Sequence, residues 1–157
     1  MVKYNKLIYY IEYLIIKRQK QTATGKDLKF NHMCMIITKK GVPLSYGYNV
    51  YDMKNQISEH AEEMALRILL ENKDRIYVKR KPLYLIVVRT NGYNSKPCSK
   101  CLELIEKYSH LINIKHICYS HEEEIDGIKK DRVKDLILGE KHISSYDRYM
   151  NRQNKNK

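Results

Sequence analysis

Two short stretches of the sequence contain side chains that could hold a metal ion. In SEHAEEMAL, His60 and Glu62 stand two residues apart, and in PCSKC, Cys98 and Cys101 stand three residues apart. At the start of a helix, the cysteine spacing puts both sulfur atoms on one side, where the positive end of the helix favours metal-binding thiolates. With His60 they would give tetrahedral Zn²⁺ three protein ligands and one open position.

An open fourth position distinguishes a catalytic zinc site from a structural one, which a fourth side chain closes. Glu62 is too close to His60 to be a comfortable second ligand. We expect it instead to hold the water at the open position and to move its proton. The cysteines alone also fit a redox pair, which leaves His60 unexplained. Half of a zinc knuckle also fits, but it needs a second ligand pair that Cys34 and Cys118 do not form. Those two cysteines lie in apolar runs and read as core thiols.

The hydrophobic pattern predicts the elements that would position these residues. Residues 4–17 have apolar side chains at helical spacing, and residues 33–38 and 43–48 read as a hairpin that a loop at 49–58 follows. The helix that carries His60 would begin near Ser58, a plausible N-cap. The remaining predicted elements are strands at 82–90 and 114–120, a helix at 97–108 with Pro97 in its first turn, and a helix at 131–138.

The order of these elements predicts an α/β fold, a three-layer α/β/α sandwich with a central mixed sheet. The continuous apolar run at 82–90 indicates a strand that is buried on both faces, as helices on both sides of a sheet require. We expect one domain over residues 1–150 and a basic, flexible tail over residues 151–157.

The joint pattern H-x-E…P-C-x-x-C resembles that of the zinc-dependent cytidine/deoxycytidylate deaminase superfamily. The resemblance covers about residues 30–120 and includes the order of the elements. It implies a Zn²⁺ cofactor held by His60, Cys98 and Cys101. It also implies that Glu62 is the catalytic proton shuttle, while a zinc-activated water attacks the amino-bearing ring carbon.

The resemblance also indicates residues that would contact the substrate. The backbone amides of Ala61 and Cys98 are candidates to position the base and the attacking hydroxyl group. Asn49, which ends SYGYN, is a candidate for a contact with the sugar, because several branches of the superfamily have an Asn at a similar place. The alternative for Asn49 is a turn residue that closes the hairpin.

The signature names a reaction and leaves the substrate open. Enzymes that act on nucleosides often have Cys where His60 stands, which favours the deoxycytidylate-like and polynucleotide-editing branches. The small size of the chain then favours a cytosine nucleotide or nucleoside, converted to a uracil product with release of ammonia. The alternatives are a base-editing deaminase of tRNA or single-stranded nucleic acid, and a non-catalytic protein of the same fold that zinc stabilises.

The net charge of +12 leaves a nucleic-acid partner open. However, 22 Lys stand against 8 Arg, and Arg is the residue suited to bidentate phosphate contacts. Abundant Ile and Asn with only 3 Ala are also typical of an AT-rich genome, such as that of a large DNA virus. Nucleic acid is therefore the less favoured partner. We expect a cytoplasmic protein without membrane attachment, because the apolar runs are short and the cysteines suit a reducing compartment. The resemblance implies a homo-oligomer.

Overall fold

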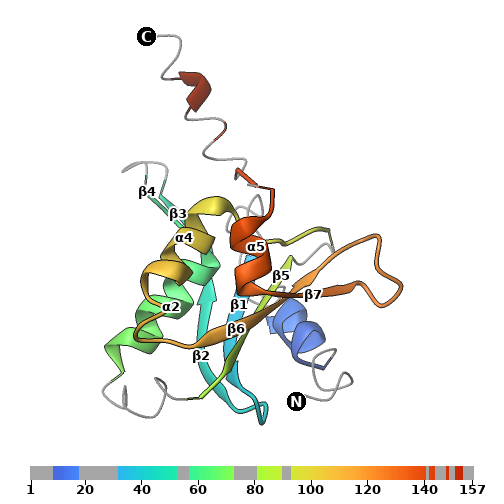
Figure 1. The fold of residues 1–157 in the computed structure, drawn as a ribbon. Coiled ribbons are helices and arrows are strands. Elements are labelled where there is room, and N and C mark those ends of the chain that lie inside the picture. Colours follow the sequence, from blue (N-terminus) through green and yellow to red (C-terminus); the bar gives the residue numbers. More distant parts are fainter. Residues whose placement is uncertain are drawn as a thin grey trace.

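A five-stranded mixed sheet forms the centre of the computed structural model (Figure 1). Its strand order is β2-β1-β5-β6-β7. The structure describes residues 9–17, 32–52, 57–72, 81–89, 93–140, 142–143, 148 and 151–153 of the 157-residue chain. The strands of the sheet are β1 (His32–Thr38), β2 (Pro43–Tyr48), β5 (Leu83–Arg89), β6 (Ile114–Ser120) and β7 (Ile128–Arg132).

Only β5 and β6 run parallel; β1 pairs antiparallel with β2 and β5, and β6 pairs antiparallel with β7. A parallel pair requires a crossover connection, and the helix α4 (Ser99–Lys107) lies in it. Two further helices are α2 (Ala61–Glu71) and α5 (Val133–Leu138), and residues 9–17 form a helix near the N-terminus. The short strands β3 (Val50–Asp52) and β4 (Ile57–Glu59) pair with each other outside the main sheet.

Helices cover both faces of the sheet, which confirms the predicted α/β/α sandwich (Figure 1). Side chains alternate between the two faces along each strand. One set, including Cys34 and Leu85, packs against α2, α4 and α5. The other set, including Met35 and Ile86, packs against Tyr10 and its neighbours in the helix of residues 9–17. The Tyr10 hydroxyl group also donates a hydrogen bond to the carbonyl of Gly41, in the turn between β1 and β2.

The strands that read as apolar runs are found within a residue of their predicted bounds. Residues 43–48 and 114–120 agree fully with β2 and β6. All side chains of β5 but the last are buried, as the continuous apolar run indicated. The N-terminal helix is confirmed over residues 9–17, whereas residues 4–8 of the prediction lie outside the described residues.

Three local predictions are wrong. The predicted loop at 49–58 contains the β3–β4 ladder, which pairs Val50 with Glu59. Ser58 is not an N-cap, because it belongs to β4 and α2 begins only at Ala61. The predicted helix at 131–138 begins at Val133, since the two residues before it complete β7.

The C-terminal segment is described only in part. Residues 151–153 form a short helical stretch with exposed side chains, and residues 154–157 of the predicted tail lie outside the described residues. Within the described part of the chain, no helix combines the length and apolar character that crossing a membrane would require.

Candidate active site

The first residue of α2 follows directly on His60, which occupies the N-cap position. The backbone of His60 is extended, with φ −77° and ψ 154°, and the His60 carbonyl accepts the hydrogen bond of the Met64 amide at 3.0 Å. Its side chain forms no capping hydrogen bond. The imidazole is therefore directed to another partner, the cysteines at the start of α4.

Gly47 allows the start of α2 to lie directly on β2. A Cβ atom at this position would be 2.0 Å from the carbonyl oxygen of Ala61 and 2.6 Å from the amide nitrogen of Ala65. Both are backbone atoms, so they cannot rotate away as a flexible side chain could. The absence of a side chain at position 47 therefore sets the position of the peptide that joins Ala61 to Glu62.

The second half of the site is the start of α4. Cys98 is its N-cap, and Cys101 lies in its first turn. Pro97 therefore precedes the cap, two residues before the first residue of α4, whereas the prediction placed it in the first turn. The amide of Ser99, between the two cysteines, donates a 2.7 Å hydrogen bond to the carbonyl of His142. A segment 43 residues further along the chain thus contacts the metal-binding loop.

The three predicted ligands lie together. The Nδ1 atom of His60 is 3.2 Å from the Sγ of Cys101 and 3.4 Å from the Sγ of Cys98. The three donor atoms all lie within 4.8 Å of one another, the one such group of metal-binding side chains among the described residues. Tetrahedral bonds of zinc to imidazole and thiolate would separate N from S by about 3.6 Å. The spacing and the donor set of one nitrogen and two sulfurs both fit zinc.

The two cysteines share protons unequally in the metal-free site. Hydrogen bonds from Cys101 and then from His60 lower the pKa of Cys98 to about 4, against the effect of burial. The hydrogen bond with Cys98, together with burial, raises the pKa of Cys101 well above its usual value. The hydrogen bond to Cys98 also raises the pKa of His60. One thiolate is thus already formed at neutral pH.

Glu62 is a buried carboxyl group at the same place. Its side chain is only 6% exposed, and burial raises its pKa to about 7. Hydrogen bonds from its own backbone amide and from the Cys101 side chain, and the nearby charge of His60, oppose that rise. A carboxyl group with a pKa near neutrality can both accept and release a proton under physiological conditions.

The predicted substrate contacts are less closely defined. Ala61 is fully buried at the first position of α2. Asn49 accepts a 2.9 Å hydrogen bond from the His32 amide through Oδ1, and its own amide donates to the His32 carbonyl at 3.3 Å. These contacts join Asn49 to the first residue of β1, at the end of the hairpin opposite its turn, and the role of Asn49 in substrate binding stays a prediction.

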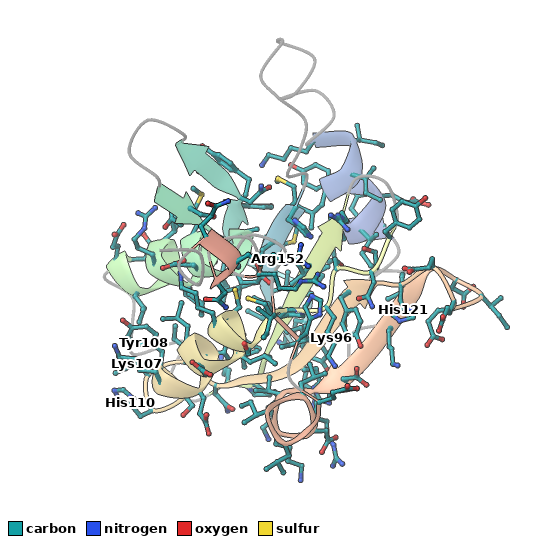
Figure 2. The ribbon with its side chains drawn as sticks, turned by 90° about the horizontal axis from the view of Figure 1, so that it is seen from above. Lys96, Lys107, Tyr108, His110, His121 and Arg152 are labelled. Atoms are coloured by element: carbon teal, nitrogen blue, oxygen red, sulfur yellow. The ribbon has the colours of Figure 1, made fainter. Side chains whose placement is uncertain are left out.

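Two lysines, one before the start of α4 and one at its end, lie apart in the structure. Figure 2 shows Lys96 near the middle of the molecule, seen from above, whereas Lys107, Tyr108 and His110 lie together at the far end of α4. Lys96 immediately precedes the buried Pro97, on the loop that leads to Cys98.

The model of the cytidine and deoxycytidylate deaminase zinc-binding region matches residues 8–119, and the chain belongs to this family. It resembles the solved cytidine deaminase from Burkholderia pseudomallei, with 16% identity, a TM-score of 0.55, and 79% of this chain and 93% of that chain covered. It also resembles a mutant cytidine deaminase from Mycobacterium tuberculosis, with 18% identity, a TM-score of 0.52, and 87% and 95% covered. At these identities the likeness concerns the fold. No sequence among the curated proteins matches significantly.

Family membership makes the protein a zinc-dependent nucleobase deaminase, a hydrolase that acts on C–N bonds of cyclic amidines in cytosine compounds. Zinc is its cofactor, and the cluster of His60, Cys98 and Cys101 is suited to hold it. Sequence reasoning missed three contributions to this site: Gly47, the carbonyl of His142, and a pair of buried serines described below. A glycine inside a predicted strand is a signal of close backbone approach, so Gly47 could have been found.

Proposed function

We propose that the protein deaminates a cytosine nucleotide or nucleoside by hydrolysis, releasing ammonia and leaving a uracil product. One observation carries the proposal: the buried carboxyl group of Glu62 lies against a donor set of one nitrogen and two sulfurs. In this proposal His60, Cys98 and Cys101 are the zinc ligands, and Glu62 is the catalytic residue.

Zinc in this position would lower the pKa of a water molecule at its open site towards neutrality. Glu62 would take a proton from the attacking water molecule as the water oxygen bonds to the amino-bearing ring carbon. The carboxyl group then gives this proton to the neighbouring ring nitrogen. It carries the second water proton to the amino group, which leaves as ammonia when the C–N bond breaks. Burial keeps the pKa of Glu62 near 7, which suits a group that must accept and donate in turn.

Backbone and side-chain groups around the carboxyl would hold the substrate. The amides of Ala61 and Cys98 are proposed to position the base and the attacking oxygen, since both lie at helix starts, where backbone amides have no partner within the helix. Asn49 is proposed to contact the sugar. Its hydrogen bonds with His32 fix the orientation of its side chain for such a contact.

A small substrate is favoured over a polynucleotide because a single phosphate needs only local positive charge. The two lysines labelled in Figure 2, Lys96 and Lys107, lie apart. We also propose a homo-oligomer, because the helix of residues 9–17 leaves Tyr9 60% exposed and Ile16 52% exposed. Light scattering at micromolar concentration measures the assembly, and a monomeric mass would contradict it.

An ammonia-release assay tests the proposal. The zinc-loaded protein is offered dCMP, CMP, cytidine, deoxycytidine, guanine and oligonucleotides, beside a Glu62→Gln variant. We expect turnover of at least one cytosine nucleotide or nucleoside, and a loss of about 10²–10⁴-fold in the variant, because a general acid–base group contributes that much. The control is zinc content, which should be equal in both proteins. Wild-type turnover in the variant would contradict the role of Glu62.

A salt series separates the small substrate from a polynucleotide. Binding of single strands loses affinity with a log–log slope of about −0.7 per contacted phosphate, whereas turnover of one nucleotide should fall only modestly. Tight, steeply salt-dependent oligonucleotide binding without turnover of small substrates would instead support the base-editing alternative. It would leave the assignment of the zinc ligands unchanged.

A further inference from the structure

The pairing between the two parallel strands of the sheet, β5 and β6, stops before their C-terminal ends. The β5–β6 ladder ends with the pairing of Val87 with Tyr119. Beyond that point Ser95 lies between the strands. Its hydroxyl group donates to the Val87 carbonyl at 2.8 Å, and its amide donates to the Ser120 carbonyl at 2.9 Å. Its hydroxyl oxygen also accepts the Ser120 amide at 2.9 Å. Ser95 thus replaces the missing ladder and bonds to both strands.

Ser120 completes this network from the other side. Its Oγ accepts a hydrogen bond from the Arg89 amide at 3.1 Å. The same Oγ lies 2.8 Å from the Tyr93 carbonyl oxygen and 2.8 Å from the Oγ of Ser95, and its single proton can serve one of these at a time. Ser95 is 3% exposed and Ser120 is 2% exposed, so water does not satisfy these groups. The beginning of the loop at residues 93–98 is therefore bonded to the ends of β5 and β6.

This network lies three residues before a metal-binding cysteine. From Ser95 the chain passes through Lys96 and the buried Pro97 to Cys98. Three residues span at most about 10 Å, so Cys98 must lie close to Ser95. A shift of Ser95 is therefore expected to displace the Cys98 sulfur. Immediately after Cys98, the amide of Ser99 bonds to His142. The sulfur is thus held from both sides along the chain.

We propose that Ser95 and Ser120 are positioning residues of the metal centre. Their hydrogen bonds fix where the loop leaves the sheet, and so the position of Cys98 relative to His60. The consequence for catalysis rests on the proposed function, whereas the consequence for metal binding does not. The competing explanation is a purely structural role, in which the two serines only contribute to the stability of the fold.

Ser45 gives a matched comparison for that structural role. It lies on β2 and is 3% exposed, as buried as Ser95, but its hydroxyl group has no hydrogen-bond partner in the structure. Replacing Ser45 by Ala removes a buried hydroxyl group without changing the loop. Replacing Ser95 by Ala removes one that joins the loop to both strands, and Ser95→Thr keeps the hydroxyl group.

The test compares Ser95→Ala, Ser120→Ala, Ser95→Thr and Ser45→Ala. Zinc affinity is measured by competition with a chelator, the stability of the metal-free protein by thermal unfolding, and ligand geometry from the visible spectrum of the Co²⁺-loaded protein. We expect Ser95→Ala to weaken zinc binding about 10–100-fold, the range found when groups that orient metal ligands are removed. Ser120→Ala should have a smaller effect. Ser95→Thr should restore zinc affinity towards the wild-type value, and Ser45→Ala should leave affinity and the cobalt spectrum unchanged.

Two results would overturn the proposal: wild-type zinc affinity in Ser95→Ala, or an equal loss in Ser45→Ala at equal stability. If Ser95→Ala does not fold, Ser120→Ala takes its place in the test. The proposal is then overturned if Ser120→Ala binds zinc as tightly as Ser45→Ala does. None of these measurements requires turnover. A protein that releases no ammonia would therefore contradict the proposed function, while the ranking of zinc affinities would still decide the role of the serines.

Discussion

The two helices that meet at the metal site are held on the sheet by different means. At the α2 side, backbone lies on backbone: Gly47 has no side chain, and an added Cβ would fall 2.0 Å from the Ala61 carbonyl oxygen. At the α4 side, buried hydroxyl groups form the connection, through Ser95 and Ser120. The first arrangement depends on the absence of a side chain at position 47, and the second depends on hydrogen bonds.

The difference follows from what each helix contributes. The α2 side provides His60 and Glu62, the proposed zinc ligand and proton shuttle, and its close backbone contact with Gly47 leaves no room for an added side chain. The α4 side provides the two cysteines, and the hydrogen bonds of Ser95 attach the loop before them to the sheet. We therefore expect damage at Gly47 to reduce turnover most, and damage at Ser95 to reduce metal affinity most.

Among the variants that test how the two helices are held on the sheet, Gly47→Ala should have the largest effect. Because the added methyl group meets backbone atoms of Ala61 and Ala65, the start of α2 must move, and a displacement of about 1 Å can cost about 10²-fold in rate. The measurement is kcat/KM with the substrate found in the ammonia screen, together with zinc content. Gly127→Ala is the control. Gly127 has φ +66° with open space around it, so this change adds strain of about 1 kcal/mol in the turn between β6 and β7 without a clash with backbone atoms. Activity within threefold of wild type in Gly47→Ala would show that the close contact is not needed.

An intermediate effect concerns the pH dependence of the metal-free protein. Burial raises the pKa of Glu62 from 4.5 to about 7, so its contribution to stability is present below pH 4.5 and is lost as the pH rises through 7. Hydrogen bonds from Cys101 and His60 lower the pKa of Cys98 from 9.0 to about 4. Its contribution is therefore complete above pH 9 and is lost as the pH falls through 4. With rising pH, the contribution of Glu62 to stability therefore decreases, whereas that of Cys98 increases.

Urea unfolding with a chelator, from pH 4.5 to 8, measures both contributions. The stability difference between wild type and Glu62→Gln should decrease with rising pH, and that between wild type and Cys98→Ser should increase. Each change should be on the order of 1–3 kcal/mol. If both stability differences changed with pH in the same direction, the assignment of the proton to Glu62 and of the thiolate to Cys98 would be contradicted.

The smallest effect is expected from the ion pair that links the two helices directly. The Nζ of Lys100 is 3.9 Å from a carboxylate oxygen of Glu63, with both side chains in contact with solvent. Such pairs contribute about 0–1 kcal/mol. Lys100→Gln should therefore change the free energy of unfolding by less than about 0.5 kcal/mol and turnover by less than twofold. Glu63→Gln serves as the reciprocal variant. A loss above 1 kcal/mol would mean that the helices hold each other, rather than each being held by the sheet.

The zinc-binding cluster could be predicted because its residue types have few other uses at that spacing. A histidine and two cysteines at two helix starts indicate one metal site even before the fold is known, and the apolar run of β5 predicts the strand that lies between them in the chain. The assignment of Glu62 as proton shuttle has the same origin and stays a prediction. Its burial beside Cys101 is what the structure adds.

The missed elements lack such signals. Strand β7 contains four consecutive charged residues, Lys129 to Arg132, and forms because an edge strand needs only one paired neighbour. Ser58 looks like an N-cap, but pairing between β3 and β4 delays the start of the helix. Ser95 and Ser120 are 25 residues apart, and nothing local in either sequence indicates that they meet. Tertiary contacts decide each of these cases.

The hydrogen bond from Ser99 to His142 has a consequence for the protein during its synthesis. His142 follows Cys101 by 41 residues. At about 5–20 residues per second, the ribosome therefore adds His142 roughly 2–8 s after Cys101. During that interval the nascent chain already contains the two thiols and their histidine, but not the carbonyl that secures the loop between them. The carbonyl that secures this loop is therefore the last of the groups described at the site to be synthesised.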